Sequence, residues 1–264
     1  MMSIEGVQAS RALVAEYTEV IASLTESEWA LPSRCAGWRV KDLVAHTGSA
    51  FRGLVDPPPV GEPDPDMTAE HAMDLLVDDR RSWSVDEVRD EFVNFAEPAL
   101  GVLAAMQDEP LASQEAAIHD LGSYPLAALA DAFAFDLYCQ LRVDLLAPEG
   151  PVVRPLPPIA GETLRPGVGW MLLGWPQMCA EVRPLLDRPL GLRLEGPGGG
   201  EFTVTPGDPL PIVHEGIRLP AAVISSSAAD FVPWGTKRSD WRESVLIEGD
   251  RDYGASILDA LNII

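Results

Sequence analysis

A proline-rich stretch near the middle of the chain separates two regions with different residue patterns. The prolines of residues 147–168 are Pro148, Pro151, Pro155, Pro157, Pro158 and Pro166. Proline lacks a backbone N–H and restricts the residue before it, so this density disfavours helices and central strands. We therefore predict a linker at residues 149–166, between one domain at 1–148 and another at 167–264. Two domains also suit a chain of 264 residues.

The first 148 residues show the 3.6-residue periodicity of amphipathic helices. The clearest apolar stripe consists of Leu13, Val14, Tyr17, Val20, Ile21 and Leu24. Further helices are predicted over residues 40–54, 68–79 and 125–146. Another begins at Ser84, where Ser-Val-Asp-Glu has the pattern of a capping box, and Pro98 is expected to kink or split it. The pattern predicts a helical first domain.

The second region mixes helical and strand patterns. Helices are predicted over residues 170–186 and 255–261, and strands over residues 191–195, 201–205, 221–225 and 244–248. The first two strands flank the glycine-rich residues 196–200, which predicts a hairpin. The predicted fold class is therefore a helical domain followed by a small α+β domain.

The chain carries a large negative charge, which excludes some classes of partner. It has 41 acidic and 19 basic residues, for a formal charge of -22. Nucleic acids and anionic membranes are bound through Lys and Arg, so we expect neither as a partner. No apolar run is long enough to span a membrane, and the first residues lack the pattern of a signal peptide. The odd number of cysteines, three, argues against a disulfide framework, so we expect a cytoplasmic protein.

Three polar side chains in helical patterns form the candidate site. Asp136 and Gln140 are four residues apart, so they point to the same side of the predicted helix at 125–146. His46 lies on the apolar stripe of another helix. A carboxylate in an apolar stripe costs several kcal/mol unless it is paired or bound to a cation. The pattern suggests a divalent metal held by His46, Asp136 and Gln140, although an amide is a weaker zinc ligand than an imidazole.

Other interpretations of these residues stay open at the level of sequence. His46 can be a core histidine, and Asp136 with Gln140 can form a buried hydrogen-bonded pair. Asp144, one further turn along, is an alternative ligand. Trp38 can either anchor the start of its helix or form a wall of the site. The histidines without ligand-like spacing are His71, His119 and His214.

One segment carries a resemblance to a known family. Residues 31–46 read Leu-Pro-Ser-Arg-Cys-Ala-Gly-Trp-Arg-Val-Lys-Asp-Leu-Val-Ala-His. The proline, Gly-Trp-x-Val and Asp-Leu-x-x-His in this order resemble the signature of the mycothiol-dependent maleylpyruvate isomerase family, part of the DinB-like superfamily. Residues 121–126 resemble the family's second signature. Residues 227–231 and 247–250 resemble its second domain, so the similarity spans nearly the whole chain.

The resemblance implies a fold and a set of site residues. The fold is a DinB-like up-and-down four-helix bundle followed by a small α+β domain of the sterol-carrier-protein type. A divalent metal, zinc or nickel, is implied at His46, Asp136 and Gln140. Gln140 stands where the family has a histidine, which predicts reduced zinc affinity, a harder metal or no metal. Residues 234–238 resemble the region that holds substrate carboxylates, which indicates Arg238 in preference to Lys237.

Two functions follow from these observations. The first, implied by the resemblance, is a mycothiol-dependent metalloenzyme of actinobacterial type, a cis–trans isomerase or S-transferase acting on a small electrophile. The coordinated thiol would lose its proton at neutral pH and become a nucleophile. The second is a non-catalytic small-molecule-binding protein whose metal site is degenerate at Gln140. The sequence leaves open whether the protein is a monomer or a homodimer, and it does not identify the substrate.

Overall fold

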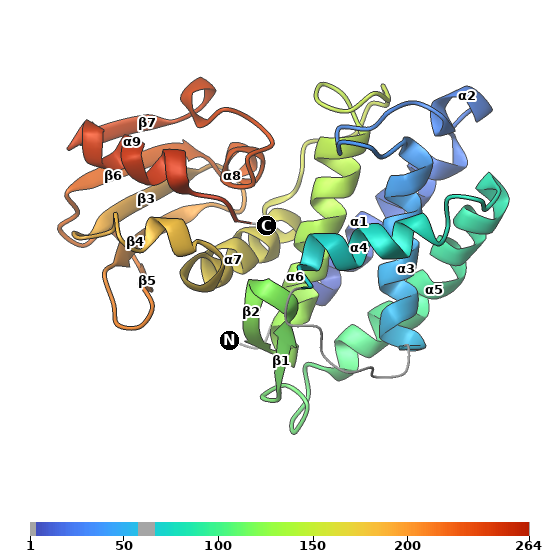
Figure 1. The fold of residues 1–264 in the computed structure, drawn as a ribbon, viewed down its shortest axis with the longest axis horizontal. Coiled ribbons are helices and arrows are strands. Elements are labelled where there is room, and N and C mark those ends of the chain that lie inside the picture. Colours follow the sequence, from blue (N-terminus) through green and yellow to red (C-terminus); the bar gives the residue numbers. More distant parts are fainter. Residues whose placement is uncertain (1–3, 58–66, 264) are drawn as a thin grey trace. The chain divides into compact units, whose positions relative to one another are not determined.

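The computed structural model describes residues 4–57 and 67–263 and divides into two compact units. The helical unit comprises residues 1–158, and the sheet unit comprises residues 159–264 (Figure 1). A helical region followed by a domain with a sheet confirms the predicted order of fold classes. Within the described residues, no helix is long and apolar enough to cross a membrane.

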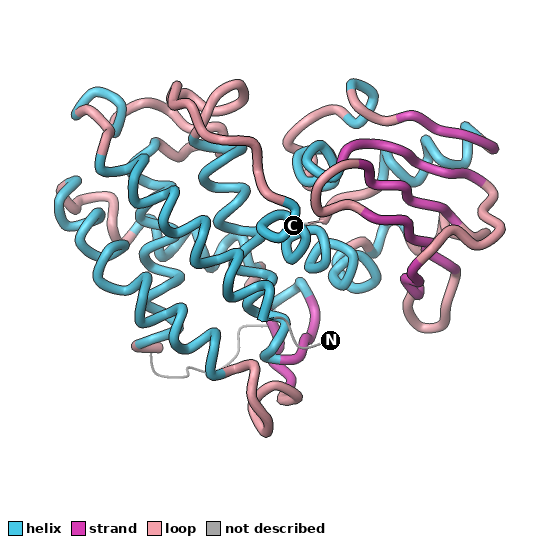
Figure 2. The backbone as a smooth tube through the Cα atoms, turned by 180° about the vertical axis from the view of Figure 1, so that it is seen from behind, coloured by secondary structure: helices cyan, strands magenta, loops and turns pink. Residues whose placement is uncertain are grey.

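The helical unit contains six α-helices in its described residues, and the last continues as a π-helix. They are α1 (Ile4–Ala22), α2 (Glu26–Trp29), α3 (Val40–Val55), α4 (Ala69–Asp78), α5 (Val85–Ala105) and α6 (Leu129–Tyr138), with the π-helix η3 at Cys139–Leu145. Helix α3 packs on α5, and α1 packs on α6. Figure 2 shows the same backbone from behind, with the helices in cyan. Their shared core includes the buried rings of Tyr17, Phe51 and Phe92, with centroids 5.1 Å apart for Tyr17–Phe92 and 5.4 Å for Phe51–Phe92.

Helix α5 begins where the sequence predicts and is not split. The Ser84 hydroxyl accepts from the Glu87 N–H, and the Glu87 carboxylate accepts from the Ser84 N–H, so the capping box is formed. Pro98 lies inside this helix, which runs without a break from Val85 to Ala105. Because proline removes only its own bond to the carbonyl four residues earlier, the turns on both sides hold the helix together.

A short hairpin precedes α6, in a region where no strands were predicted. Strands β1 (Glu115–Ile118) and β2 (Gly122–Pro125) pair antiparallel, with Ile118 opposite Gly122. Pro125, expected to open the last helix, instead ends β2. A 3-10 turn, η2 (Leu126–Ala128), then leads into α6. The fixed φ of proline suits the edge of a strand as well as the first turn of a helix, so local preference does not distinguish the two.

The sheet unit has one five-stranded sheet in its described residues. The strands are β3 (Leu190–Glu195), β4 (Gly200–Thr205), β5 (Ile212–Glu215), β6 (Ala222–Ser227) and β7 (Leu246–Gly249), in the order β5-β4-β3-β6-β7. Strands β3 and β6 are parallel, and the other pairs are antiparallel. Leu194 lies opposite Gly200 across the glycine-rich turn, so the predicted hairpin is present.

Three helices accompany this sheet in the described residues; two differ in their bounds from the predicted helices, and the other was not predicted. They are α7 (Gly161–Met178), α9 (Arg251–Ala260) and the unpredicted α8 (Ala228–Gly235). Helix α7 begins inside the stretch predicted as a linker and ends before the predicted 186. Pro166 is buried within it, so apolar packing of this helix outweighs the missing hydrogen bond that proline causes.

Candidate functional site

The structure brings His46, Asp136 and Gln140 together. His46 lies on α3, in a run that is buried from Val40 to Ser49. Its Nε2 lies 3.2 Å from Asp136 Oδ1 on α6. Gln140, in the first turn of η3, donates through Nε2 to the same oxygen at 3.3 Å. The three side chains therefore meet at one carboxylate oxygen.

The members of this trio differ in their access to solvent. The side chain of Asp136 is 31% exposed, whereas that of His46 is 8% exposed. Gln140 is buried. Within the described part of the chain, His46 Nδ1 and Gln140 Oε1 are buried and have no hydrogen-bond partner. Asp136 is therefore the most accessible of the three, and Gln140 has an acceptor oxygen without a partner in the described residues.

The spacing of the trio can be compared with that of a metal site. A tetrahedral ion with bonds of about 2.0–2.1 Å separates its ligand atoms by about 3.4 Å. The two separations at Asp136 Oδ1, 3.2 and 3.3 Å, are close to that value. Gln140 presents its amide nitrogen, so ligation through Oε1 requires a half-turn of the amide. With the amide turned, the trio would offer a divalent cation two strong donors and one weak donor.

Asp144 does not complete this set. Across residues 4–57 and 67–263, no three or more His, Cys, Asp or Glu side chains are grouped so as to hold a metal ion. Asp144 is buried within η3, and its carbonyl accepts from the Arg34 N–H. Burial raises the pKa of the Tyr17 hydroxyl, and the charges of Asp136 and Asp144 raise that pKa further. Both carboxylates thus affect the pKa of Tyr17. Because the described residues hold no such group of ligands, the alternative of Asp144 as a metal ligand is wrong.

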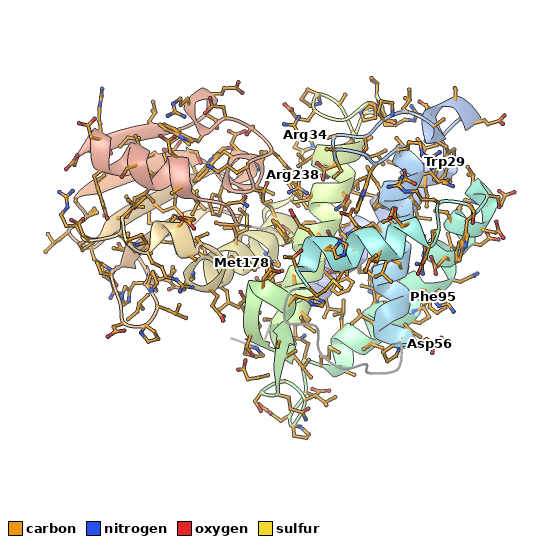
Figure 3. All side chains as sticks on the ribbon, viewed as in Figure 1. Trp29, Arg34, Asp56, Phe95, Met178 and Arg238 are labelled. Carbon is orange, nitrogen blue, oxygen red and sulfur yellow. The ribbon has the colours of Figure 1, made fainter. Side chains whose placement is uncertain are left out.

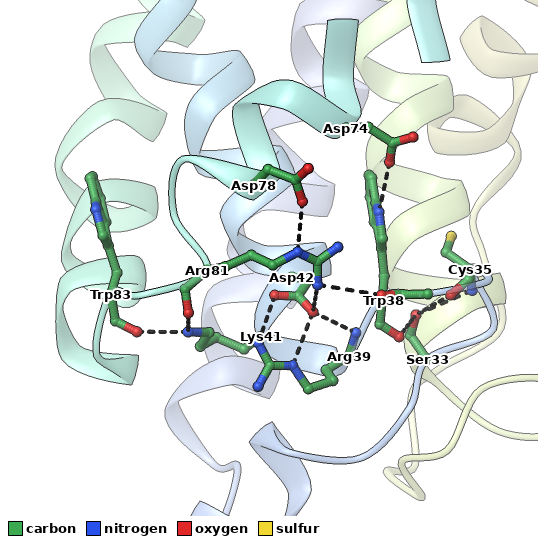
Figure 4. Close-up of polar contacts among 11 residues, drawn as sticks. Ser33, Cys35, Trp38, Arg39, Lys41, Asp42, Asp74, Asp78, Arg81 and Trp83 are labelled. Carbon is green, nitrogen blue, oxygen red and sulfur yellow. Dashed lines mark hydrogen bonds and ion pairs between the residues drawn. The ribbon is translucent and has the colours of Figure 1, made fainter. Parts of the chain in front are cut away.

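Trp38 lies beside His46 and has a second contact that the sequence did not indicate. The ring centroids of Trp38 and His46 are 5.3 Å apart, with 43° between the ring planes. The indole Nε1 of Trp38 donates to Asp74 Oδ1 on α4 at 2.9 Å (Figure 4). Trp38 therefore both precedes α3, as an anchor would, and packs on the imidazole, as a wall would. No local pattern marks Asp74, because its role depends on a tertiary hydrogen bond.

The remaining candidates lie in different surroundings. His71 is exposed on α4, His119 has a positive φ of 42° in the turn of the β1–β2 hairpin, and His214 on β5 bonds Thr205. In the sheet unit, Arg238 follows α8 and is half-buried (Figure 3). The Lys237 ammonium donates to the carbonyls of Leu258 and Asp259, at the end of α9. The role of Arg238 in binding a carboxylate stays a prediction.

Comparison with known proteins agrees with the resemblance given by residues 31–46. Residues 10–132 match a family model described as the mycothiol maleylpyruvate isomerase N-terminal domain. A crystal structure of the mycothiol-dependent maleylpyruvate isomerase is similar, with a TM-score of 0.58 and 18% sequence identity, covering 92% of this chain and 92% of that chain. The structure of a histidine-to-alanine mutant of that enzyme gives a TM-score of 0.57, with 18% identity and 92% coverage of both chains.

These matches differ in what they establish. No curated protein matches the sequence. At 18% identity, the two solved structures show a shared fold. The family match covers Trp38 and His46 but ends before Asp136 and Gln140. The predicted family resemblance is confirmed, and the roles of the site residues stay predictions.

Proposed function

Because its helical unit matches the mycothiol maleylpyruvate isomerase family, we propose that the protein uses mycothiol to act on a small electrophile. The reaction is cis–trans isomerisation or transfer of the whole thiol to the electrophile, with the conjugate kept. The observation that supports this proposal most is the convergence of His46 and Gln140 on one oxygen of Asp136. A histidine beside a partly exposed carboxylate is an arrangement suited to removing a proton from a thiol.

Asp136 is the proton acceptor in this proposal. It is the most exposed of the three residues, and the N–H groups of His46 and Gln140 hold its Oδ1 in place. The carboxylate takes the proton of the thiol as the thiol enters the site, which leaves a thiolate. Since the thiolate is the nucleophilic form of sulfur, this step activates the bound thiol.

The thiolate then reacts with an activated double bond. It forms a C–S bond at one carbon, and the π electrons move to an adjacent carbonyl oxygen. The former double bond is now single and rotates. Return of the electrons expels the thiolate and restores the double bond in the other configuration. The thiolate then takes back the proton from Asp136, which regenerates the thiol and the carboxylate. In S-transfer, the adduct takes up a proton instead and keeps the C–S bond.

A divalent cation fits this site under one condition. His46 Nε2, the Asp136 carboxylate and the amide oxygen of Gln140 would hold it, with the amide turned from its present orientation. When bound, the cation would supply positive charge that keeps a thiol deprotonated at neutral pH. Arg238 is proposed to bind a carboxylate of the substrate, because a planar guanidinium matches that group.

The test combines thiol binding, metal content and turnover. Protein purified without chelators is analysed for metals, titrated with mycothiol and assayed with maleylpyruvate. We expect His46→Ala to lose thiol binding and isomerisation. His71→Ala, at an exposed histidine of α4, should retain both. A wild-type protein that binds no thiol, or a His46→Ala variant that binds it as the wild type does, would overturn the proposal.

A non-catalytic binding protein is the second candidate function. It is favoured by the fact that Asp136 Oδ1 already accepts from both His46 and Gln140, so the carboxylate is satisfied without a cation. This alternative predicts small-molecule binding with neither bound metal nor turnover in the experiment above. Near-stoichiometric zinc or nickel in the purified protein would instead favour the enzyme.

A further inference from the structure

The imidazole of His46 is held at only one of its two ring nitrogens by a hydrogen bond in the described residues. A functional histidine is commonly held through the ring nitrogen that does not face the reaction, by a carboxylate or a carbonyl. Within the described residues, His46 Nδ1 is buried and has no hydrogen-bond partner. The contact of Nε2 with Asp136 fixes one atom of the ring. A second contact is needed to stop the ring from turning about the bond to Cβ.

Trp38 provides that second contact. Its ring centroid is 5.3 Å from that of the imidazole, within the range of aromatic packing. The two rings are tilted at 43°, so the indole restricts the imidazole on one side. Because His46 is buried, there is little room for its ring to rotate while Trp38 stays in place.

Trp38 is itself fixed at its backbone. It ends the turn of residues 33–38, in which the Ser33 N–H donates to the Trp38 carbonyl and the Trp38 N–H donates to the Cys35 carbonyl. Gly37 has φ of 80°, a conformation that a residue with a side chain rarely adopts, so glycine allows this turn. The backbone therefore presents the indole to α3 in one direction.

The indole side chain has a separate anchor on α4. Asp74 Oδ1 accepts from Trp38 Nε1 at 2.9 Å. Helix α4 buries few side chains of its own, Ala69 and Val77. Polar contacts hold its two ends: the Ala69 N–H donates to Asp120 Oδ1 at 2.8 Å, and Asp78 Oδ1 accepts from Arg81 Nε at 2.7 Å. The position of α4 is thus transmitted to the indole through one hydrogen bond.

Arg81 ties the C-terminal end of α4 to the start of α3. Its Nη1 lies 3.3 Å from Asp42 Oδ2 and donates to the Gly37 carbonyl at 3.4 Å (Figure 4). Asp42 is buried and also accepts from Arg39. Although burial alone would raise it, these arginines hold the pKa of the Asp42 carboxyl below its usual value. The turn that carries Trp38 is therefore held by Arg81 at its backbone, in addition to the contact of the indole with Asp74.

We propose that Trp38 is a positioning residue for His46 and that Asp74 fixes the indole in the orientation this requires. The inference deepens the proposed function, because it concerns how the imidazole of that site is aimed at Asp136. Trp38 does not touch the reacting atoms. Loss of the Trp38–Asp74 hydrogen bond should let the imidazole turn and weaken its contact with Asp136. Removal of such an outer residue commonly lowers activity by about 10-fold or more.

The test uses variants of α4 that differ in one hydrogen bond. Asp74→Ala removes the acceptor, and Asp74→Asn keeps an oxygen in its place. Glu70→Ala, on the same helix, removes an exposed carboxylate that contacts neither Trp38 nor Arg81 and serves as the matched control. Trp38→Phe keeps an aromatic ring but has no N–H. All variants are examined as full-length protein, with thermal melting to verify that each is folded.

Two readouts separate positioning from stability. NMR of protein treated with a chelator follows the ring protons of His46 and the indole N–H of Trp38, and steady-state kinetics with mycothiol and maleylpyruvate follow kcat and KM. We expect Asp74→Ala to shift both sets of resonances and to lower kcat about 10-fold with KM little changed. Asp74→Asn should restore the wild-type values, and Glu70→Ala should resemble the wild type.

Certain results would overturn the inference. In one, Asp74→Ala shifts the indole resonance but leaves the His46 ring protons unchanged, which means that Trp38 does not position the imidazole. In another, neither resonance moves, which means that Asp74 does not hold Trp38. If the wild-type protein shows no turnover at all, the proposed function fails, while the NMR comparison still decides the role of Trp38.

Discussion

At the scale of single residues, Gln140 determines how the carboxylate of Asp136 is used. Its amide nitrogen donates to Asp136 Oδ1, and its Oε1 is buried without a partner in the described structure. An imidazole at this position would offer a nitrogen lone pair to a cation, whereas the amide offers an N–H to the carboxylate. The same backbone can therefore support a metal site or a hydrogen-bonded site, according to one side chain.

The substitution Gln140→His should increase zinc affinity. It gives the site two imidazoles and a carboxylate, a donor set of the kind found in catalytic zinc sites. We expect zinc to bind at least about 10-fold more tightly than in the wild type. Replacement of a residue that only contacts a metal ligand already changes metal affinity by about 10-fold or more. Competition with a chromophoric chelator measures this affinity. Equal affinities would mean that position 140 does not face the cation.

The substitution Asp136→Asn should abolish activity with little change in shape. Asparagine keeps an acceptor oxygen for His46 but cannot take a proton from the thiol. Loss of a general base costs about 100-fold or more in rate. The measurement is kcat/KM with mycothiol and maleylpyruvate. Glu70→Gln, which replaces an exposed carboxylate on α4 by an amide, is the control. A rate for Asp136→Asn within 2-fold of that control would contradict the role of Asp136.

Part of this site could be predicted from sequence because helix geometry places residues four apart on one side. Asp136 and Gln140 meet for this reason, and a polar residue on an apolar stripe singled out His46. Asp74 could not be predicted in this way. It is an exposed acid on α4, and only the tertiary contact with Trp38 distinguishes it from Asp78.

At the scale of elements, the last helix of the helical unit differs most from its prediction. The periodicity predicts one helix over 125–146, but the structure has a strand end, a 3-10 turn, α6 and the π-helix η3. The 3-10 helix, the α-helix and the π-helix space their apolar residues similarly over a few residues. Periodicity in the sequence therefore does not distinguish between them. The change to a π-helix begins directly after Tyr138, beside Gln140, and such segments are frequent at functional sites.

The pairing of α2 with the segment after η3 should make stability depend on acid pH. The Arg154 guanidinium donates to Glu28 on α2. This contact, with hydrogen bonds from Thr25, lowers the pKa of Glu28 from 4.5 to about 2. A carboxylate whose pKa is lowered by folding stabilises the fold above its unfolded pKa, and the effect is lost as pH falls from about 4.5 towards 2.

Glu28→Gln tests this coupling. Its free energy of unfolding, measured with urea, should be below that of the wild type at pH 6, and the gap should narrow at pH 3. Glu26→Gln, on the same helix, is the matched control and should show a smaller gap at pH 6. A gap for Glu28→Gln that stays constant between the two pH values would show that the carboxylate charge is not responsible.

At the scale of the whole molecule, the negative net charge of the protein opposes the approach of an anionic substrate. The formal charge of -22 repels an anionic electrophile over long range. Recognition of a carboxylate therefore depends on local positive groups, and Arg238 is the proposed one. The long-range repulsion is screened by salt, whereas a contact at the guanidinium is screened much less.

This difference predicts how turnover responds to ionic strength. Raising the salt from about 10 mM to about 150 mM shortens the Debye length from about 30 Å to about 8 Å, so long-range repulsion should weaken. We expect kcat/KM for maleylpyruvate to rise over this range and kcat/KM for an uncharged electrophile to stay constant. Arg238→Ala should lower kcat/KM for maleylpyruvate at every salt concentration, while Arg251→Ala, at the start of α9, should not. A fall in kcat/KM of the wild type with salt would mean that attraction by basic residues, and not repulsion by the acidic surface, controls the approach of the substrate.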